Sequence, residues 1–293
     1  MRHALLRHAR RWIAALTTLG CAGGCTPEQV LLLHPAGPVA RTERDIILLS
    51  IGLVSIVVVP VIVLLGYIVR RFRDRPGNDA PYQPDWSESP WLEVVWWGIP
   101  IVIIGILAVA TVRQTFALTR PPAASGPPLT VQVTSLNWKW LFQYPEHGIA
   151  TVNYCEIPVG RPVEFVLTSN APMNSFWVPQ LGGQEYTMAG MAMRLWLQAD
   201  KPGTYYGHGA NFSGQGFAHM HFRVIAVPQP AFARWAREVQ AHAPALTWAG
   251  YQRLVQPGLA RETAYSSYPP GIFAHLVEQE GGMYMKHPAY GTD

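Results

Sequence analysis

Two long hydrophobic runs dominate the first half of the chain. Residues 46–69 contain no charged side chain, and as an α-helix they would extend about 36 Å. The second run covers residues 91–117 and is uncharged from Val94 to Val112. Since about 20 apolar helical residues cross the ~30 Å of a bilayer's hydrocarbon, the pattern predicts two transmembrane helices. Core helices of a large soluble protein are the alternative, which runs of this length disfavour.

The segment between the two runs predicts their orientation. Residues 70–75 contain four arginines and one aspartate, so the loop at residues 70–90 is expected on the cytoplasmic side. Residues 25–45 and the chain beyond residue 117 are then external. Pro60 removes one helical hydrogen bond and predicts a bend that a neighbouring helix supports. We expect Glu93 to be solvated at the membrane interface, with a buried ion pair as the alternative.

After a Pro- and Ala-rich linker at residues 118–128, the period of the hydrophobic pattern changes. Residues 129–227 contain short runs rich in β-branched and aromatic residues, beginning with LTVQVTSLNWKWLF and separated by Gly, Pro and Asn. About 100 residues of this kind predict an all-β sandwich. Residues 228–293 open with an amphipathic helix candidate, FARWAREVQAH, and end in a Tyr-, Pro- and Gly-rich stretch. We expect this helical and aromatic-rich tail to pack along another surface.

Composition agrees with a membrane protein and excludes a nucleic-acid binder. Charged residues make up 14% of the chain and hydrophobic residues 49%. The formal net charge is +4, but this excess comes from four arginines at the N-terminus: Arg2, Arg7, Arg10 and Arg11. The rest of the chain has no net charge, and nucleic-acid binding requires clustered Lys and Arg.

Residues 1–24 have the pattern of an export signal, with an Arg-rich start, a short apolar run and small residues before Cys21 and Cys25. We expect lipoprotein processing with Cys25 as the acylated residue and Cys21 as the less favoured site. Ordinary signal cleavage, or none, is the alternative. Cys155 then has no cysteine partner and is expected to be a small buried hydrophobic residue.

Three motifs carry a resemblance to a known family. They are NWKW at 137–140, MNSFWVPQ at 173–180 and YYGHGANFSGQGFAHMHFRV at 205–224. In this order, after two membrane helices, they resemble subunit II of the haem-copper oxidases, and most closely the quinol branch, the cytochrome bo-type ubiquinol oxidases. The resemblance covers about residues 25–290. It implies that the sandwich at 129–227 is cupredoxin-like.

The resemblance makes the presence of copper the deciding question. Subunit II of the cytochrome c branch holds two coppers through two bridging cysteines, two histidines, a methionine and a carbonyl. In this chain Gly209 and Ser213 occupy the cysteine positions, and Asn174 and Phe217 occupy the histidine positions. Met220 is the one side-chain ligand retained. Because a thioether and a hydroxyl cannot replace bridging thiolates, we predict that the dinuclear centre is lost.

Other candidate ligands and aromatics give weaker signals. His219 and His221, spaced i and i+2 on an expected strand, could bind zinc or copper weakly, with His208 nearby in sequence. Surface or hydrogen-bonded histidines are the favoured alternative. The same alternation places Trp138 and Trp140 on one face, suited to packing in the sandwich or against a partner. The resemblance assigns the position of Trp138 to electron entry, but without copper it has no acceptor.

The resemblance implies a non-catalytic subunit of a proton-pumping ubiquinol oxidase in the bacterial inner membrane, with the N-terminus and β-domain in the periplasm. Its implied partners are subunit I, further small membrane subunits and the lipid bilayer. We expect no cofactor in this chain, and in the complex two haems of b and o type, one copper in subunit I, and ubiquinone. The sequence shows no nucleophile elbow, P-loop or dinucleotide fingerprint. The rivals are a copper-carrying cytochrome c oxidase subunit and an unrelated membrane-anchored lipoprotein binding module.

Overall fold

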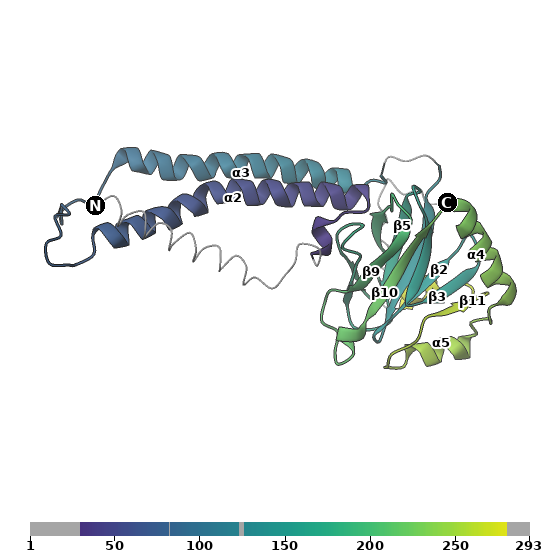
Figure 1. Cartoon of the computed structure of the whole chain (residues 1–293). Coiled ribbons are helices and arrows are strands. Elements are labelled where there is room, and N and C mark those ends of the chain that lie inside the picture. Colours follow the sequence, from purple (N-terminus) through teal and green to yellow (C-terminus); the bar gives the residue numbers. More distant parts are fainter. Residues whose placement is uncertain (1–29, 82, 123–125, 280–293) are drawn as a thin grey trace, which may run out of the picture.

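Two long helices run side by side away from a β-domain in the computed structural model, which describes residues 30–81, 83–122 and 126–279 (Figure 1). They are α2, Pro38–Arg71, and α3, Pro90–Leu118. Their most apolar windows have mean hydropathies of 3.1 and 2.3, and 0% and 6% of these windows is buried. Both helices are therefore long and apolar enough to cross a membrane, as predicted, and their side chains are open to lipid or to another protein.

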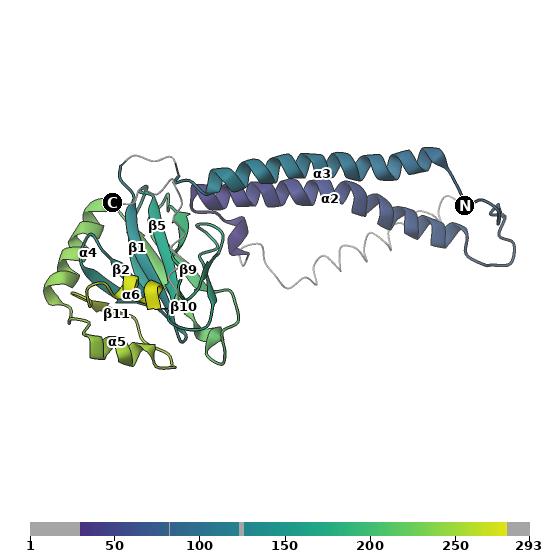
Figure 2. The same cartoon turned by 180° about the vertical axis from the view of Figure 1, so that it is seen from behind.

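Proline shapes the first of these helices. Pro60 lies inside α2, and both views show α2 bending away from α3 past its middle (Figures 1 and 2). A proline ring displaces the carbonyl four residues earlier and leaves it without its helical donor, which opens the helix at that point. The bend predicted from the sequence is thus present. α2 begins well ahead of the uncharged run at residue 46, because Pro38 supplies a favourable first helical position.

The β-domain is a sandwich of two sheets, which confirms the predicted fold class. Strands β11-β3-β2-β1-β5-β8 form one sheet and β4-β10-β9-β6-β7 the other. The strands are β1 Leu129–Leu136, β2 Lys139–Tyr144, β3 Ile149–Val152, β4 Tyr154–Pro158, β5 Val163–Ser169, β6 Asn174–Trp177, β7 Glu185–Thr187, β8 Met193–Leu197, β9 Gly203–Gly209, β10 His221–Val227 and β11 Thr263–Tyr265. The pairs β1–β5 and β4–β10 are parallel; the other pairs are antiparallel.

Aromatic side chains from both sheets fill the space between them. The rings of Phe176 and Phe222 stack with centroids 4.8 Å apart, and Trp140 meets Phe176 edge-on at 5.4 Å. Each such ring is fully or almost fully buried, which contributes about 1.5–3 kcal/mol to folding. Cys155 is fully buried in the same core, as predicted for a small hydrophobic residue.

The described part of the C-terminal extension packs on the sandwich in two places. It comprises α4 Gln229–His242, α5 Trp248–Val255 and α6 Ile272–Gln279, with β11 added to the sheet edge. α4 adds Phe232, Ala236 and Val239 to the core between the sheets, while the residues after it cover the outer face of the six-stranded sheet. A second apolar cluster lies between sheet and extension: Leu136, Leu141, Ala150, Val152, Leu246, Tyr251, Ile272 and Leu276. The extension therefore packs on the sandwich, as expected, and gives the sheet a second buried face.

The start of α2 is attached to the β-domain by main-chain hydrogen bonds. Ala36 N donates to Gln180 O at 2.7 Å, Ala40 N to Leu181 O at 3.2 Å, and Asp200 N to Ala36 O at 2.9 Å. A short 3-10 helix, η2 (Leu31–Leu33), precedes this contact. Backbone bonds of this kind hold the domain at the N-terminal end of α2.

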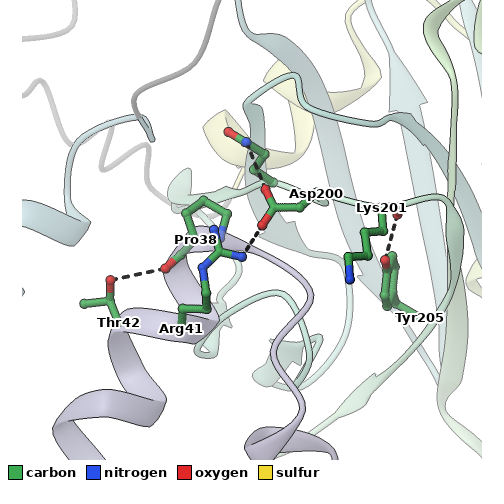
Figure 3. Close-up of polar contacts among 7 residues, drawn as sticks. Pro38, Arg41, Thr42, Asp200, Lys201 and Tyr205 are labelled. Carbon is green, nitrogen blue, oxygen red and sulfur yellow. Dashed lines mark hydrogen bonds and ion pairs between the residues drawn. The ribbon is translucent and has the colours of Figure 1, made fainter.

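Side chains complete the same contact (Figure 3). The Arg41 guanidinium pairs with the Asp200 carboxylate, and Thr42 Oγ1 donates to Pro38 O within the first turn of α2 at 3.2 Å. Glu43 accepts a hydrogen bond from Gly183 N at 2.8 Å. Gly37 lies so close to the Gln198 carbonyl that a Cβ at this position would overlap it. The close backbone approach therefore requires glycine at position 37.

Candidate functional site

Loops at one end of the sandwich bring most of the predicted site residues together. The β9–β10 loop, residues 210–220, contains the 3-10 helix η3 (Phe217–His219). Its Asn211 side chain donates to Met173 O at 3.2 Å, next to the start of β6. The β1–β2 turn joins it from the other sheet, where Trp138 Nε1 donates to Ser213 O at 3.0 Å.

Asn174 is the centre of this group. Its Nδ2 donates to Ser213 Oγ at 2.8 Å and contacts Met220 Sδ at 3.0 Å, while its Oδ1 accepts from Ser175 N at 2.7 Å. Asn174 is 1% exposed and Met220 2% exposed. Because a buried amide must find partners inside the protein, this amide–hydroxyl–thioether group is a satisfied polar network.

Gly209 completes the network by leaving room for it. A Cβ built at this position would stand 2.6 Å from Asn174 Oδ1, so any larger residue requires Asn174 to move. The backbone of Gly209 is held by its N–H, which donates to Met220 O at 2.9 Å. The space in which a cysteine side chain would begin is thus taken by the Asn174 amide.

Phe217, the remaining position that corresponds to a copper ligand, has a different environment. Phe217 lies in η3, and its ring packs edge-on against Phe212 with centroids 5.7 Å apart. Phe212 is 76% exposed and lies at the surface of the β9–β10 loop. A phenyl ring offers no lone pair to a metal, so this position contributes an apolar surface.

The residues of this site do not fit a dinuclear copper centre. They provide an amide, a hydroxyl and a thioether, with neither the soft bridging thiolates nor the imidazoles that such a centre requires. Cys155 lies in the apolar core, where burial, with a smaller effect of Glu156, raises the pKa of its thiol well above the usual value. In the described part of the chain no three His, Cys, Asp or Glu side chains gather as metal ligands.

The two tryptophans of NWKW have different positions, which corrects the expectation that they share one strand face. The expected single run is a hairpin, and Trp138 lies in its two-residue turn with φ 66°. Its ring packs on the β9–β10 loop, where a Cβ on Gly216 would overlap it. Trp140 is fully buried in β2. The alternation argument was wrong because no Gly or Pro marks the turn.

Asn137 and Lys139 were missed by the sequence reasoning. Asn137 Nδ2 donates to Val255 O at 3.2 Å, and Lys139 Nζ donates to Leu254 O at 2.8 Å and Gln256 O at 2.5 Å. The ammonium thereby binds the carbonyl end of α5, where the helix dipole favours a cation. Burial lowers the pKa of Lys139. The available signal was a lysine at the first position of a largely apolar strand.

The histidines are also arranged differently from the prediction. His219 belongs to η3, and β10 begins only at His221, so the expectation that both lie on one face of a strand was wrong. His221 instead stands opposite His208 across the β9–β10 pair. Sequence spacing missed this because the loop between the strands sets the register.

One carboxyl group at the edge of the five-stranded sheet has a strongly changed proton affinity. Burial, together with the nearby Glu238 carboxylate of α4, raises the pKa of Glu156 to about 7. The Tyr144 hydroxyl donates to Glu156 O at 3.0 Å and accepts from Glu156 N at 2.9 Å, which fixes the local backbone. Glu156 lies on β4, whereas the Asn174 network lies on β6, β9 and the β9–β10 loop.

The predicted signal segment and both lipidation candidates, Cys21 and Cys25, lie outside the described residues.

Comparison with known proteins identifies the family. Residues 149–227 match the family model of the cytochrome c oxidase subunit II periplasmic domain. The chain is 45% identical over 255 residues to quinol oxidase subunit 2 of Bacillus cereus, covering 86% of this chain and 87% of that protein. The chain belongs to the quinol oxidase subunit 2 family. It is also 41% identical over 272 residues to cytochrome bo(3) ubiquinol oxidase subunit 2 of Pseudomonas aeruginosa, covering 92% and 81%.

The quinol oxidase relatives confirm the resemblance drawn from the three motifs. Among solved structures, the chain is similar to the periplasmic domain of subunit II of cytochrome oxidase of Bradyrhizobium japonicum, with 23% identity, a TM-score of 0.38, and coverage of 41% of this chain and 96% of that one. The quinol oxidase relatives cover most of the chain, helices and β-domain together. Neither rival reading is favoured by these matches.

Proposed function

We propose that this chain is a subunit II without the dinuclear copper centre, in a ubiquinol oxidase complex that reduces oxygen to water and pumps protons across the bacterial inner membrane. The observation that carries the proposal is the Asn174 network. Its amide donates to Ser213 Oγ at 2.8 Å and fills the space beside Gly209. The polar atoms of this group are already hydrogen-bonded within the protein and do not need a metal as a partner. The group also lacks the bridging thiolates that a dinuclear copper centre requires.

In this proposal electrons never pass through the β-domain. Quinol is oxidised at subunit I, which holds the haems of b and o type and the single copper of the complex. The chain contributes α2 and α3 as packing surfaces for subunit I and further small membrane subunits, and its β-domain covers the periplasmic face. Support comes from the bonds between residues 36–43 and the domain, since a rigidly placed domain suits a cap better than a tethered one does.

The absence of acidic residues from the segments around Asn174 favours the same role. Residues 129–145, 170–183 and 207–222 contain no Asp or Glu, and they include the turn, the loops and the strand ends around Asn174. A cationic soluble electron carrier would need carboxylates at its landing surface to be attracted there. A lipid-soluble quinol has no such need.

Purification of the intact complex in mild detergent tests the proposal. We expect a haem-bearing multi-helix partner, oxygen uptake driven by ubiquinol and unaffected by added cytochrome c, and one copper per complex after removal of loosely bound metal. As a matched pair, Ser213→Ala and Asn174→Ala should keep the turnover of assembled complex, because neither residue carries electrons. Two additional coppers per chain, or oxygen uptake that depends on cytochrome c, would overturn the proposal.

We also propose that Cys25 is acylated after signal cleavage and that this lipid positions the N-terminal segment. Two spanning helices hold a chain in the membrane far more firmly than acyl groups do. Cys25→Ala should therefore remain in the membrane fraction while the N-terminal peptide loses its lipid mass, and Cys21→Ala should retain that mass. Recovery of soluble Cys25→Ala protein would contradict the anchoring by α2 and α3.

A further inference from the structure

Two histidines face each other on the outer surface of the five-stranded sheet. His208 of β9 is the direct cross-strand neighbour of His221 of β10. The next pair toward the β9–β10 loop, Gly209 and Met220, is hydrogen-bonded, since Gly209 N donates to Met220 O at 2.9 Å. Antiparallel pairs alternate, so His208 and His221 form a non-hydrogen-bonded pair, in which Cα atoms are about 4.5 Å apart and side chains are closest.

Burial shows on which side of the sheet the pair lies. Phe222, the neighbour of His221, is 1% exposed and belongs to the core. Because successive side chains of a strand point to opposite faces, His221 points outward, and it is exposed. His208 lies on the same outer face, half-buried. The pair is thus on the opposite side of the strands from the core.

One of the two imidazoles has a defined tautomer. His208 Nδ1 lies 2.8 Å from Gly209 O. A carbonyl oxygen can only accept, so Nδ1 carries a proton, and in the neutral imidazole Nε2 therefore keeps its lone pair. Metal-binding histidines are commonly held in this way, with one ring nitrogen donating to a carbonyl and the other facing the metal.

Aromatic rings restrict both imidazoles. The Tyr206 ring lies 5.4 Å from the His208 ring and 6.1 Å from the His221 ring, tilted by 30° in each case. The Trp177 ring lies 5.2 Å from His208 on its other neighbouring strand. Side chains that are already ordered lose less entropy when they bind a ligand.

A cationic side chain on the same strand and face, Arg223, is paired with a carboxylate. Arg223 follows His221 at the next outward position of β10, and its Nε donates to Glu262 Oε1 at 2.7 Å. Its charge therefore opposes a bound cation less than an unpaired guanidinium would.

We propose that His208 and His221 form a two-imidazole site for a divalent transition-metal cation, open to the external solution. Imidazole favours Cu²⁺ over the other common divalent ions of the first transition row. In the described part of the chain no third His, Cys, Asp or Glu joins them, so water completes the coordination and the metal exchanges. The site has no role in electron transfer and is independent of the proposed oxidase function.

Titration of the purified full-length chain with Cu²⁺, after stripping with a chelator, tests the site. We expect a mononuclear adduct whose electron paramagnetic resonance spectrum shows two coordinated nitrogens, and weaker binding of Zn²⁺. His208→Gln and His221→Gln should each lower the Cu²⁺ affinity at least about tenfold, since changes in the surrounding shell alone cost that much. His219→Gln, in the adjacent η3, is the matched control and should bind as the unaltered chain does.

Unchanged affinity in both His208→Gln and His221→Gln, or an equal loss in His219→Gln, would overturn the site. Thermal melting of each variant separates a lost ligand from a lost fold, and His221→Gln, at an exposed position, should melt as the unaltered chain does. Ubiquinol oxidase turnover should also be unchanged in His221→Gln. A thiolate-bridged dinuclear signal would instead contradict the absence of a dinuclear copper centre proposed above, and its persistence in His208→Gln and His221→Gln would show that the histidines do not hold the copper.

Discussion

Gly209→Ala should destabilise the β-domain although alanine is the smallest possible addition. The new Cβ would stand 2.6 Å from Asn174 Oδ1, well inside van der Waals contact. Gly209 does not have a positive φ, so the backbone itself accepts alanine. The strain therefore falls on Asn174, which is 1% exposed and donates to Ser213 Oγ at 2.8 Å.

The expected cost follows from two contributions. Forcing a methyl group into a packed interior costs about 1–3 kcal/mol, and displacing a buried amide from its partners costs about 1–3 kcal/mol. Partial relaxation makes the two overlap, so we expect about 2–4 kcal/mol in all. For a domain of this size, that corresponds to a fall in Tm of about 5–15 °C.

Thermal unfolding of the detergent-solubilised chain, followed by tryptophan fluorescence, measures this change. Gly203→Ala is the matched control in the same strand, because a Cβ there would meet its nearest atom, Tyr205 Oη, at an ordinary 3.5 Å. Asn174→Ala removes the obstructing amide, so Gly209→Ala should cost less in that background. A Gly209→Ala protein as stable as Gly203→Ala, or an equal cost in both backgrounds, would refute the reasoning.

Three further changes have defined outcomes. Folding raises the pKa of Glu156 from 4.5 to about 7. Between these values the unfolded chain has released the proton and the folded chain has not, so the free energy of unfolding falls as the pH rises from about 4.5 to 7. Glu156→Gln should therefore melt like the unaltered chain near pH 4 and at a higher temperature above pH 7. Lys139→Met leaves the Leu254 and Gln256 carbonyls without their donor, so faster amide hydrogen exchange in α5 and a loss of about 1–3 kcal/mol are expected. Gly37→Ala should loosen the contact between the start of α2 and the β-domain and so increase proteolysis there. Arg41→Ala removes only an exposed ion pair, which costs at most about 1 kcal/mol, and should increase proteolysis less. Equal proteolysis of the two variants would contradict the role given to the backbone contact.

Several elements could be predicted because their signal is local. The absence of charge over residues 46–69 makes that helix apolar enough to cross a membrane wherever it packs, and Pro60 bends it through its own ring. The strand Val163–Ser169 follows from its β-branched and aromatic residues, although the structure buries it on both faces. The loss of thiolate ligands at Gly209 and Ser213 also follows from residue identity once the motif is aligned. The Asn137–Trp138 turn was missed because neither Gly nor Pro marks it.

The sequence by itself determined that thiolate and imidazole ligands are absent from the positions corresponding to the copper ligands. The tertiary structure decided which contacts these positions make instead. Asn174 meets Ser213 and Met220 across 39 and 46 residues of chain, and Lys139 reaches α5 across 115. The pairing of His208 with His221 depends on the register of two strands. Periodicity reports the face on which a side chain lies, but only packing of distant segments determines which side chain meets it there.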